Sequence, residues 1–586
     1  MKSYLTIAIL FLQITVLKAQ WSVIDTDQYP QQSWYKYQPF TRAEWEGSNF
    51  ASPEKMKWFT DARYGMFIHF GLSAYVDKDV SWPICYTRKA PDTGHGAYPD
   101  SVWHKWPSKF KLENFNADEW VQIARDAGMK YIVVIGKHHD GFHMWDTRFS
   151  DFKITNTPFG RDFLKEIADA CHKVNMPFGI YYSQRDWYHP DYAPVDPSMV
   201  RASAEPPYFE VLPGKKLGPG PSHKKYIDYQ FNVVRELCTK YGKIDLFWFD
   251  AAWWGGMFTS DMWDSENLTR MIRKLQPDIV INNRASVPGD FDTPEQQIGT
   301  YQSRPWESCM TLNGEWAHST SPNRSEKNLI RDLLSSAQGN GNVLLSWGPL
   351  WDGKFDTVQK KLLLDIGGWL KKYGDGIYGT KGGPWLPEKW GGATYKGNKI
   401  YVYVYDWKDG KLSLPAIPGN AILNLKYLNV TGRPAFEVKK EKWQFSRPES
   451  PDDIATIIEL EMAKPVTGVL NRQKQSFFDS PEYGAAIKTA EIITSDWKNG
   501  KYLIDLKKNH MLTGIGIYGS NDPIAISVSL NGKDWKKAGV INSTRKEMAM
   551  TTYLSGAEVL GKNARYLQFN QQGKSGPITF TIYAKE

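Results

Sequence analysis

Two acidic residues of this chain stand where a sequence could place a pair of catalytic carboxylates. Asp250 ends the run LFWFD, in which every other residue is apolar, and Glu307 lies in the segment SRPWESC. Enzymes that cleave glycosidic bonds with retention hold two carboxyl groups about 5–5.5 Å apart, one as nucleophile and one as acid/base. We interpret Asp250 as the candidate nucleophile and Glu307 as the candidate acid/base. Glu295 and Glu315 remain alternatives for the second role, and an aspartate after a strand also commonly caps a helix.

The elements that must position these residues alternate between short apolar runs and amphipathic stretches. Buried parallel strands appear as continuous apolar runs, and their alternation with helices is typical of parallel β/α architecture. The pattern therefore predicts the α/β class, with parallel β/α architecture over about residues 34–380. The predicted strands are 64–71, 131–137, 177–183, 245–252, 279–285 and 342–348.

Polar side chains follow five of these strands at their carboxyl ends. They are His69, the segment 137–140, the segment 181–183, Asp250 and the segment 282–284. Because chemistry in a barrel gathers at the carboxyl ends of the strands, we expect these side chains to converge on one site.

The segment KHHD at 137–140 contains two residue types that bind metal ions. Adjacent residues of a strand point to opposite faces, so His138 and His139 are not expected to share one ion. We expect both rings to hydrogen-bond to sugar hydroxyls, and we predict neither a metal nor a cofactor. The sequence has no GxSxG nucleophile elbow, no GxGxxG fingerprint and no phosphate-binding loop.

The pattern changes after about residue 380. Residues 383–466 and 467–586 contain alternating polar and apolar runs such as KIYVYVYDW and ITFTIYAKE, which are typical of half-buried strands. We predict a catalytic domain at 20–382 followed by one or two antiparallel β-sandwich domains, at 383–466 and 467–586.

The first 19 residues resemble a secretory signal peptide, because Lys2 precedes an apolar stretch from Leu5 to Leu17 that is too short to span a membrane. We therefore expect export to the periplasm or the medium, without a membrane anchor. The formal net charge is +8 and no dense basic run occurs, so nucleic-acid binding is not supported.

The tryptophan content is compatible with a carbohydrate partner and equally with the aromatic cores of a large β-rich secreted enzyme. Indole rings stack on the apolar faces of sugars, and the chain contains 25 Trp. Its four cysteines have no CxxC spacing, which indicates neither a disulfide scaffold nor a zinc site. We expect an oligosaccharide or polysaccharide substrate, and the oligomeric state is left open.

Several segments carry a family resemblance when they are taken together and in order. They are YGMFIHFGLSAY, YIVVIGKHHDGFHMWDTRFSDFKI, GRDFLKEIADACHK, FGIYYSQRDWY, LFWFDAAW, INNR and IGGWLKKYGDGIYGT. Over about residues 55–380, and more loosely to 465, the chain resembles glycoside hydrolase family 29, the α-L-fucosidase family. The resemblance implies a degenerate (β/α)8 TIM-like barrel. It also implies exo-acting release of terminal α-L-fucose by double displacement with retention, without a metal.

The resemblance also implies roles for individual residues. It places the nucleophile at Asp250 through FWFD and favours Glu307 as acid/base through WESCMTLNGEW. Phe67 is expected to face the C6 methyl group that distinguishes fucose from L-galactose. The remaining residues expected to bind the sugar are His69, His138, His139, Tyr181, Trp248, Arg284, Trp316 and Trp347.

The chain departs from the family pattern at positions expected near the sugar. Ala251 replaces a common glycine, Phe70 replaces the Trp of HWG, and Ser346-Trp347 interrupts the usual LLNIGP. These departures leave two alternatives: an exo-α-L-galactosidase acting on algal galactan oligosaccharides with the same machinery, and a catalytically inactive sugar-binding protein. Residues 467–586 resemble discoidin-like carbohydrate-binding modules, on SVSLNGKDWKKAG and ARYLQF.

Overall fold

The computed structural model describes the chain from residue 48 to residue 585 with internal gaps. The gaps are 77–79, 85–97, 99, 193–221, 251–262, 286, 300, 302–303, 471–484, 487–492, 495–500, 519–523, 542–553, 556–561 and 572–578. The predicted signal peptide and Ala251 therefore lie outside the described residues.

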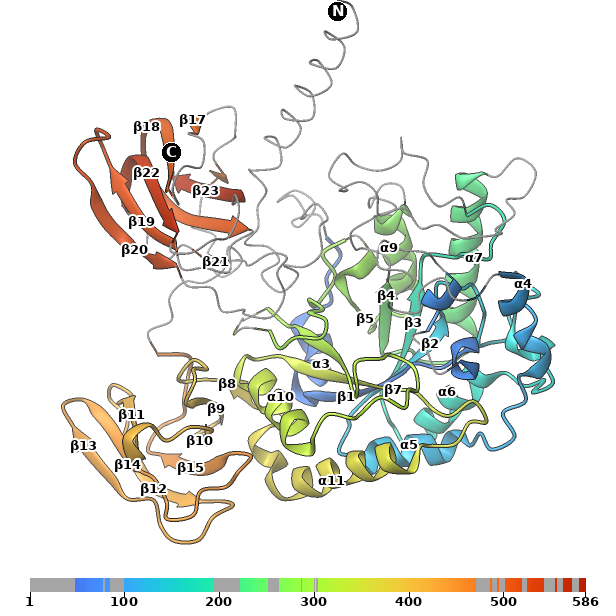
Figure 1. Ribbon diagram of the computed structural model, residues 1–586, viewed down its shortest axis with the longest axis horizontal. Coiled ribbons are helices and arrows are strands. Elements are labelled where there is room, and N and C mark those ends of the chain that lie inside the picture. Colours follow the sequence, from blue (N-terminus) through green and yellow to red (C-terminus); the bar gives the residue numbers. More distant parts are fainter. Residues whose placement is uncertain are drawn as a thin grey trace, which may run out of the picture.

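Seven parallel strands form the central sheet, in the order β5-β4-β3-β2-β1-β7-β6. All six predicted strands are present, and the seventh is β6, which begins at Glu307. The strands are β1 (Tyr64–Ile68), β2 (Ile132–Lys137), β3 (Phe178–Ser183), β4 (Leu246–Asp250), β5 (Val280–Ile281), β6 (Glu307–Thr311) and β7 (Asn342–Trp347). Figure 1 shows these strands surrounded by the helices of the same domain.

A segment without regular strand assignment closes the sheet into a barrel. Parallel bridges join Asn282 to Phe291, Asp292 to Trp306 and Glu295 to Cys309. Residues 291–295 therefore lie between β5 and β6 and act as the eighth strand. The predicted degenerate (β/α)8 barrel is confirmed, and its irregularity lies in this eighth strand, which pairs through isolated bridges.

Helices cover the outside of the barrel, and most begin with a side chain that accepts a hydrogen bond from their first turn. Asn116 caps α5 in this way and Asp162 caps α6. The helices are α3 (Pro53–Ala62), α4 (Asp100–Trp103), α5 (Ala117–Asp126), α6 (Phe163–Lys173), α7 (His223–Lys240), α9 (Ser265–Leu275), α10 (Glu326–Gln338) and α11 (Thr357–Tyr373). No helix in the described part of the chain has the length and apolar character to cross a bilayer.

Strand alternation separates two apolar layers. Every second side chain along a strand points into the barrel interior, as Phe67 and Leu344 do. The intervening side chains pack between the sheet and the helices, as Leu345 and Trp347 do. Each strand residue therefore faces either the interior, where a site can form, or the helices.

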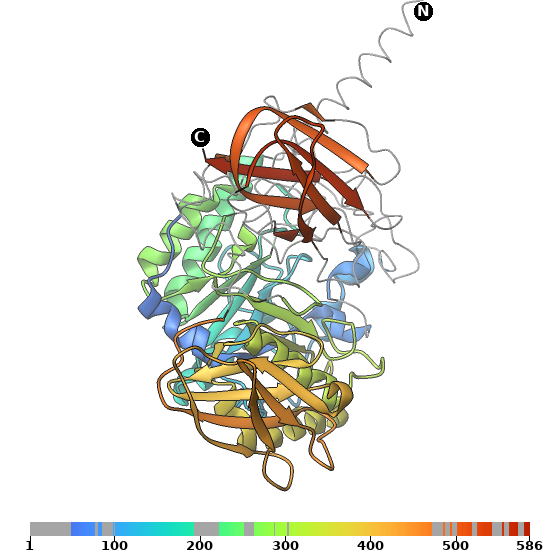
Figure 2. The same ribbon diagram turned by 90° about the vertical axis from the view of Figure 1, so that its left-hand side faces the viewer.

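Two antiparallel units follow the barrel and stand apart from each other at its periphery (Figures 1 and 2). The first packs a five-stranded sheet and a three-stranded sheet around one core. Its strands are β8 (Lys381–Gly382), β9 (Gly391–Lys396), β10 (Lys399–Val404), β11 (Lys411–Pro415), β12 (Ile422–Tyr427), β13 (Phe436–Lys439), β14 (Lys442–Ser446) and β15 (Thr456–Met462). It contacts the barrel domain through Tyr403, whose hydroxyl donates to the carbonyl of Gly376 at 2.7 Å.

The second unit is an antiparallel sheet with a core of its own. Its described strands are β16 (Ala485–Ala486), β17 (Ile493–Thr494), β18 (Lys501–Tyr518), β19 (Ile524–Ser529), β20 (Lys536–Ile541), β21 (Leu554–Ser555), β22 (Asn563–Gln571) and β23 (Thr579–Lys585). The second unit falls within the predicted domain 467–586, whereas the first begins with β8, two residues before the predicted domain 383–466. The domain boundaries stay predictions.

Candidate active site

The carboxyl ends of the strands bring together the polar residues that were expected to converge. Asp250 ends β4 beside Ser183, the last residue of β3. The Tyr181 hydroxyl donates to Asp250 Oδ2 at 2.7 Å, and Arg284 Nη1 donates to Oδ1 at 3.2 Å. The next helix described, α9, is preceded by Asp264, so Asp250 is not its N-cap.

The environment of Asp250 is polar but almost closed to water. Its residue is 8% exposed, and this burial raises the pKa of the carboxyl group above its usual value. The Arg284 guanidinium and the Tyr181 hydroxyl act in the opposite direction, because both stabilise the charged form. Burial also holds the pKa of Tyr181 far above its usual value, so this hydroxyl keeps the proton that it donates.

Three histidines surround the same opening, and a serine hydroxyl fixes each ring. The Nδ1–Oγ distances are 2.8 Å for His69 with Ser346, 2.6 Å for His138 with Ser81 and 2.7 Å for His139 with Ser183. Burial lowers the pKa of His69 to about 3 and the pKa values of the other two well below the usual range. The rings are therefore neutral near pH 7, and each can donate one hydrogen bond and accept another.

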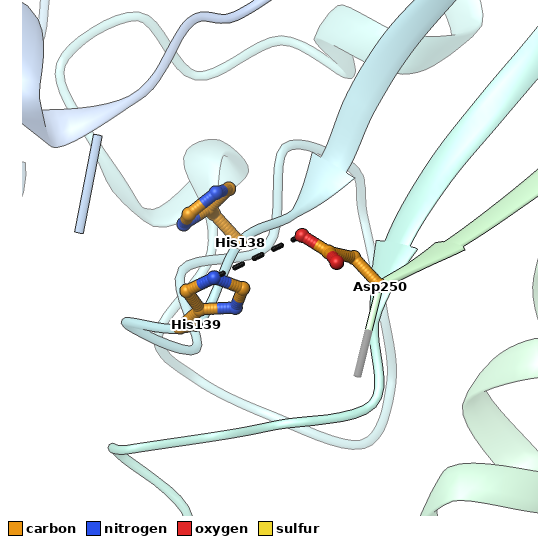
Figure 3. A group of neighbouring side chains, drawn as sticks. All are labelled: His138, His139 and Asp250. Atoms are coloured by element: carbon orange, nitrogen blue, oxygen red, sulfur yellow. Dashed lines mark ion pairs between the residues drawn. The ribbon is translucent and has the colours of Figure 1, made fainter. Parts of the chain in front are cut away.

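The argument from strand alternation fails for His138 and His139. Strand β2 ends at Lys137, and a turn follows in which Gly141 N donates to His138 O at 3.1 Å. Outside the strand the side chains no longer alternate, and the two ring centroids lie only 3.9 Å apart. Figure 3 shows both rings beside Asp250.

Aromatic side chains line the interior below these polar groups. The ring of Phe67 lies within 6.2 Å, centroid to centroid, of the rings of His69, Tyr181, Trp248 and Trp316. Trp248 stacks on Tyr181 at 5.5 Å, and the Arg284 guanidinium lies 4.6 Å from the indole of Trp248. Eight of the nine residues expected to bind sugar are thus together: Phe67, His69, His138, His139, Tyr181, Trp248, Arg284 and Trp316.

Trp347 is the ninth, and the structure places it elsewhere. Its ring stacks on Phe355 and meets Trp120 edge-on in the layer between sheet and helices. The preceding residue, Ser346, faces the interior instead and contacts both His69 Nδ1 and the carbonyl of Trp316. Period-two alternation along β7 could have identified this serine. Phe70 also lies in the outer layer, so that departure from the family pattern lies outside the barrel interior.

Glu307 lies at the wrong edge of the barrel for an acid/base. It is the first residue of β6 and pairs with Asn342, the first residue of β7. Asp250, by contrast, is the last residue of β4. Glu307 is 0% exposed and accepts hydrogen bonds from the Tyr131 hydroxyl and from Trp248 Nε1. Burial raises the pKa of this carboxyl group to about 7, but the group is enclosed by protein.

Glu295, the alternative, lies beside the candidate nucleophile. It ends the irregular eighth strand, and its Oε2 accepts a hydrogen bond from Arg284 Nη2 at 2.8 Å. One guanidinium group therefore contacts both Asp250 and Glu295. The side chain of Glu295 is 17% exposed, so a ligand can reach it. The segment TPEQQ has no apolar run that would have predicted a strand here.

Comparisons with known proteins agree with this architecture. The family model for Alpha-L-fucosidase matches residues 30–375. Alpha-L-fucosidase of Dictyostelium discoideum is 25% identical over 65% of this chain and 85% of its own length. The plasma alpha-L-fucosidase of Homo sapiens is 26% identical over 60% of this chain and 76% of its own.

Solved structures extend the comparison. Alpha-L-fucosidase isoenzyme 1 from Paenibacillus thiaminolyticus matches with a TM-score of 0.61 and 31% identity, over 70% of this chain and 99% of its own. The alpha-L-fucosidase from Vibrio sp. strain EJY3 shares the fold over 92% of this chain and 98% of its own, with a TM-score of 0.63 and 21% identity. The chain belongs to the α-L-fucosidase family, glycoside hydrolase family 29.

Proposed function

We propose that the protein is an exo-acting retaining glycoside hydrolase that releases terminal α-L-fucose from glycans, with Asp250 as nucleophile and Glu295 as acid/base. The observation that carries this assignment is Arg284, whose two terminal nitrogens contact one carboxylate each. This shared contact places both carboxylates beside one guanidinium group, which is compatible with the roughly 5–5.5 Å separation of retaining enzymes.

In the first step an oxygen of Asp250 attacks the anomeric carbon while Glu295 gives its proton to the departing glycosidic oxygen. Arg284 and Tyr181 hold the Asp250 carboxylate in a fixed orientation for this attack. In the second step Glu295, now ionised, removes a proton from water, and that water cleaves the fucosyl ester with a second inversion. The anomeric configuration is therefore retained.

The sugar pocket has the chemistry that a 6-deoxy sugar requires. Neutral imidazole rings of His69, His138 and His139 can bind hydroxyl groups in either hydrogen-bonding sense. Phe67 offers an apolar surface in the barrel interior, which suits a methyl group rather than a hydroxymethyl group. These features support fucose, and neither the L-galactosidase nor the inactive sugar-binding protein is favoured by the comparisons.

The reaction's stereochemistry tests this proposal. Proton NMR of aryl α-L-fucoside hydrolysis should show α-L-fucose before the β-anomer appears by mutarotation. Aryl α-L-galactoside, assayed in parallel, should be cleaved more slowly, because its C6 hydroxyl would meet Phe67. If the β-anomer appears first, the double displacement is wrong. Binding of L-fucose without any turnover would instead indicate the inactive sugar-binding protein.

We also propose that the chain is exported after cleavage behind Ala19, which the charge and apolar pattern of its first residues supports. Amino-terminal sequencing of the protein recovered from outside the cytoplasm should begin at Gln20. An uncleaved amino terminus in a cell-retained protein would contradict export.

A further inference from the structure

Three side chains of types that bind transition metals meet at the carboxyl end of the barrel. His138, His139 and Asp250 each offer one ligand atom, and these atoms all lie within 4.8 Å of one another. His139 Nε2 is 4.0 Å from Asp250 Oδ2, and Figure 3 shows both imidazole rings on one side of the carboxylate. Each of the three residues is at most 8% exposed.

A second observation is that each of the two histidines is oriented by a serine of its own. Ser81 Oγ lies 2.6 Å from Nδ1 of His138, and Ser183 Oγ lies 2.7 Å from Nδ1 of His139. Histidines that bind metal usually have a hydrogen bond at the nitrogen away from the ion, which fixes the ring orientation. With Nδ1 engaged in both rings, Nε2 is the nitrogen presented to a cation.

We propose that His138, His139 and Asp250 bind a Zn²⁺ ion, which excludes the sugar and inhibits the enzyme reversibly. Two imidazole nitrogens, one carboxylate oxygen and a water molecule form a common tetrahedral zinc environment. A carboxylate bonded to Zn²⁺ cannot attack an anomeric carbon, so the bound ion competes with the glycoside. Its role is inhibitory, and the double displacement itself needs no metal.

The geometry requires only local adjustment. Zinc–ligand bonds of roughly 2.1 Å place tetrahedral ligand atoms about 3.4 Å apart. Because the present ligand atoms lie within 4.8 Å of one another, side-chain movements that shorten the largest separation by about 1.4 Å close the site. The Arg284 guanidinium, 3.2 Å from Asp250 Oδ1, repels a cation and weakens its binding. Nitrogen ligands disfavour Mg²⁺ and Ca²⁺, which prefer oxygen.

The inhibitory part of this inference rests on the proposed function, whereas metal binding can be measured without any turnover. Calorimetric titration of ZnCl₂ into the chelator-treated full chain should show one site, and MgCl₂ should give no binding heat. The variants His139→Asn and Asp250→Asn should abolish the site. Ser81→Ala should weaken it about 10–100-fold, since loss of an orienting partner costs that much affinity. His172→Asn, on the outer helix α6, is the matched control and should bind normally.

Two measurements keep the test decisive. If the buried variants fail to fold by circular dichroism, the visible spectrum of Co²⁺ bound to the unmodified chain should still show mixed nitrogen and oxygen ligation. L-fucose should displace the ion and Zn²⁺ should raise KM without lowering kcat. No binding to the unmodified chain, or undiminished binding to folded Asp250→Asn, would overturn the zinc site. Zinc binding that depends on Asp250 but does not respond to L-fucose would uphold the site and count against the proposed function.

Discussion

Two buried carboxyl groups lie inside the same barrel, and only one of them lies at its carboxyl edge. Asp250 ends its strand at the carboxyl edge, beside Arg284 and three histidines. Glu307 begins its strand at the opposite edge, enclosed by Tyr131 and Trp248. Glu307 has the raised pKa expected of a general acid. The difference shows that burial and a raised pKa do not identify a catalytic acid unless the group also faces the opening where substrate enters.

The largest effect on turnover is expected from a substitution at the carboxyl edge of the barrel. Asp250→Ala removes the nucleophile, so kcat on an aryl α-L-fucoside should fall about 10⁴-fold or more. Asp245→Asn is the matched control, because Asp245 precedes the amino end of the same strand and accepts from Phe178 N. Its kcat should stay within about tenfold of the unmodified chain. Near-normal turnover by Asp250→Ala would remove Asp250 from the mechanism.

The second comparison separates the two candidate acids. Glu295→Ala should lower kcat about 10²–10⁴-fold, and sodium azide should restore turnover of an activated aryl fucoside as fucosyl azide, because a small anion needs no general base. Glu307→Gln should lose less than about tenfold and show no azide rescue. Glu315→Gln, in the loop after β6, tests the remaining alternative in the same assay. Rescue of the Glu307 or Glu315 variant in place of Glu295→Ala would overturn the assignment of Glu295.

The third prediction concerns stability rather than turnover. The folded pKa of Glu307 is about 7, above its ordinary value of 4.5, so the folded protein keeps a proton that the unfolded chain loses between these pH values. The contribution of Glu307 is fully present below about pH 4.5 and is lost as the pH rises through 7. The glutamine of Glu307→Gln does not titrate in this range. The melting temperature of this variant should therefore rise relative to that of the unmodified chain as the pH increases. The difference in free energy of unfolding between the two proteins should change by up to roughly 1.4 kcal/mol per pH unit. If the melting temperatures of both proteins changed in parallel with pH, this prediction would be contradicted.

Most of the fold could be predicted because its strands are buried on both faces and therefore appear as apolar runs. The run LFWFD and the run NVLLSW needed no partner information to be recognised. The closing segment 291–295 could not be predicted this way, because it pairs through three isolated bridges and contains few apolar residues. This segment carries Glu295, so the weakest strand signal coincides with the residue that we propose as acid/base.

The site was predictable to the extent that strand ends can be located in a sequence. Apolar runs indicate where β3 and β4 end, and their polar last residues indeed converge. An apolar run does not reveal at which height along the barrel axis the neighbouring strand begins. The acid/base role was therefore assigned to Glu307 without the knowledge that this residue begins its strand at the opposite edge. Nor does it reveal where a strand gives way to a turn, which is why His138 and His139 were expected to diverge.

The smallest effects are expected from substitutions at two neighbouring residues of β7 whose side chains point to opposite faces of the sheet. Ser346→Ala removes the hydroxyl that contacts His69 Nδ1 and donates to the carbonyl of Trp316. The loss of these two hydrogen bonds, about 0.5–1.5 kcal/mol each, should lower kcat/KM roughly tenfold with little change in melting temperature. Trp347→Phe, one residue further, leaves a cavity against Phe355 and Trp120. It should destabilise the barrel by about 1–3 kcal/mol and leave kcat/KM unchanged. If instead Trp347→Phe altered the ratio of fucoside to galactoside hydrolysis at unchanged stability, the outward orientation of Trp347 would be wrong, and with it the assignment of Ser346 to the sugar pocket.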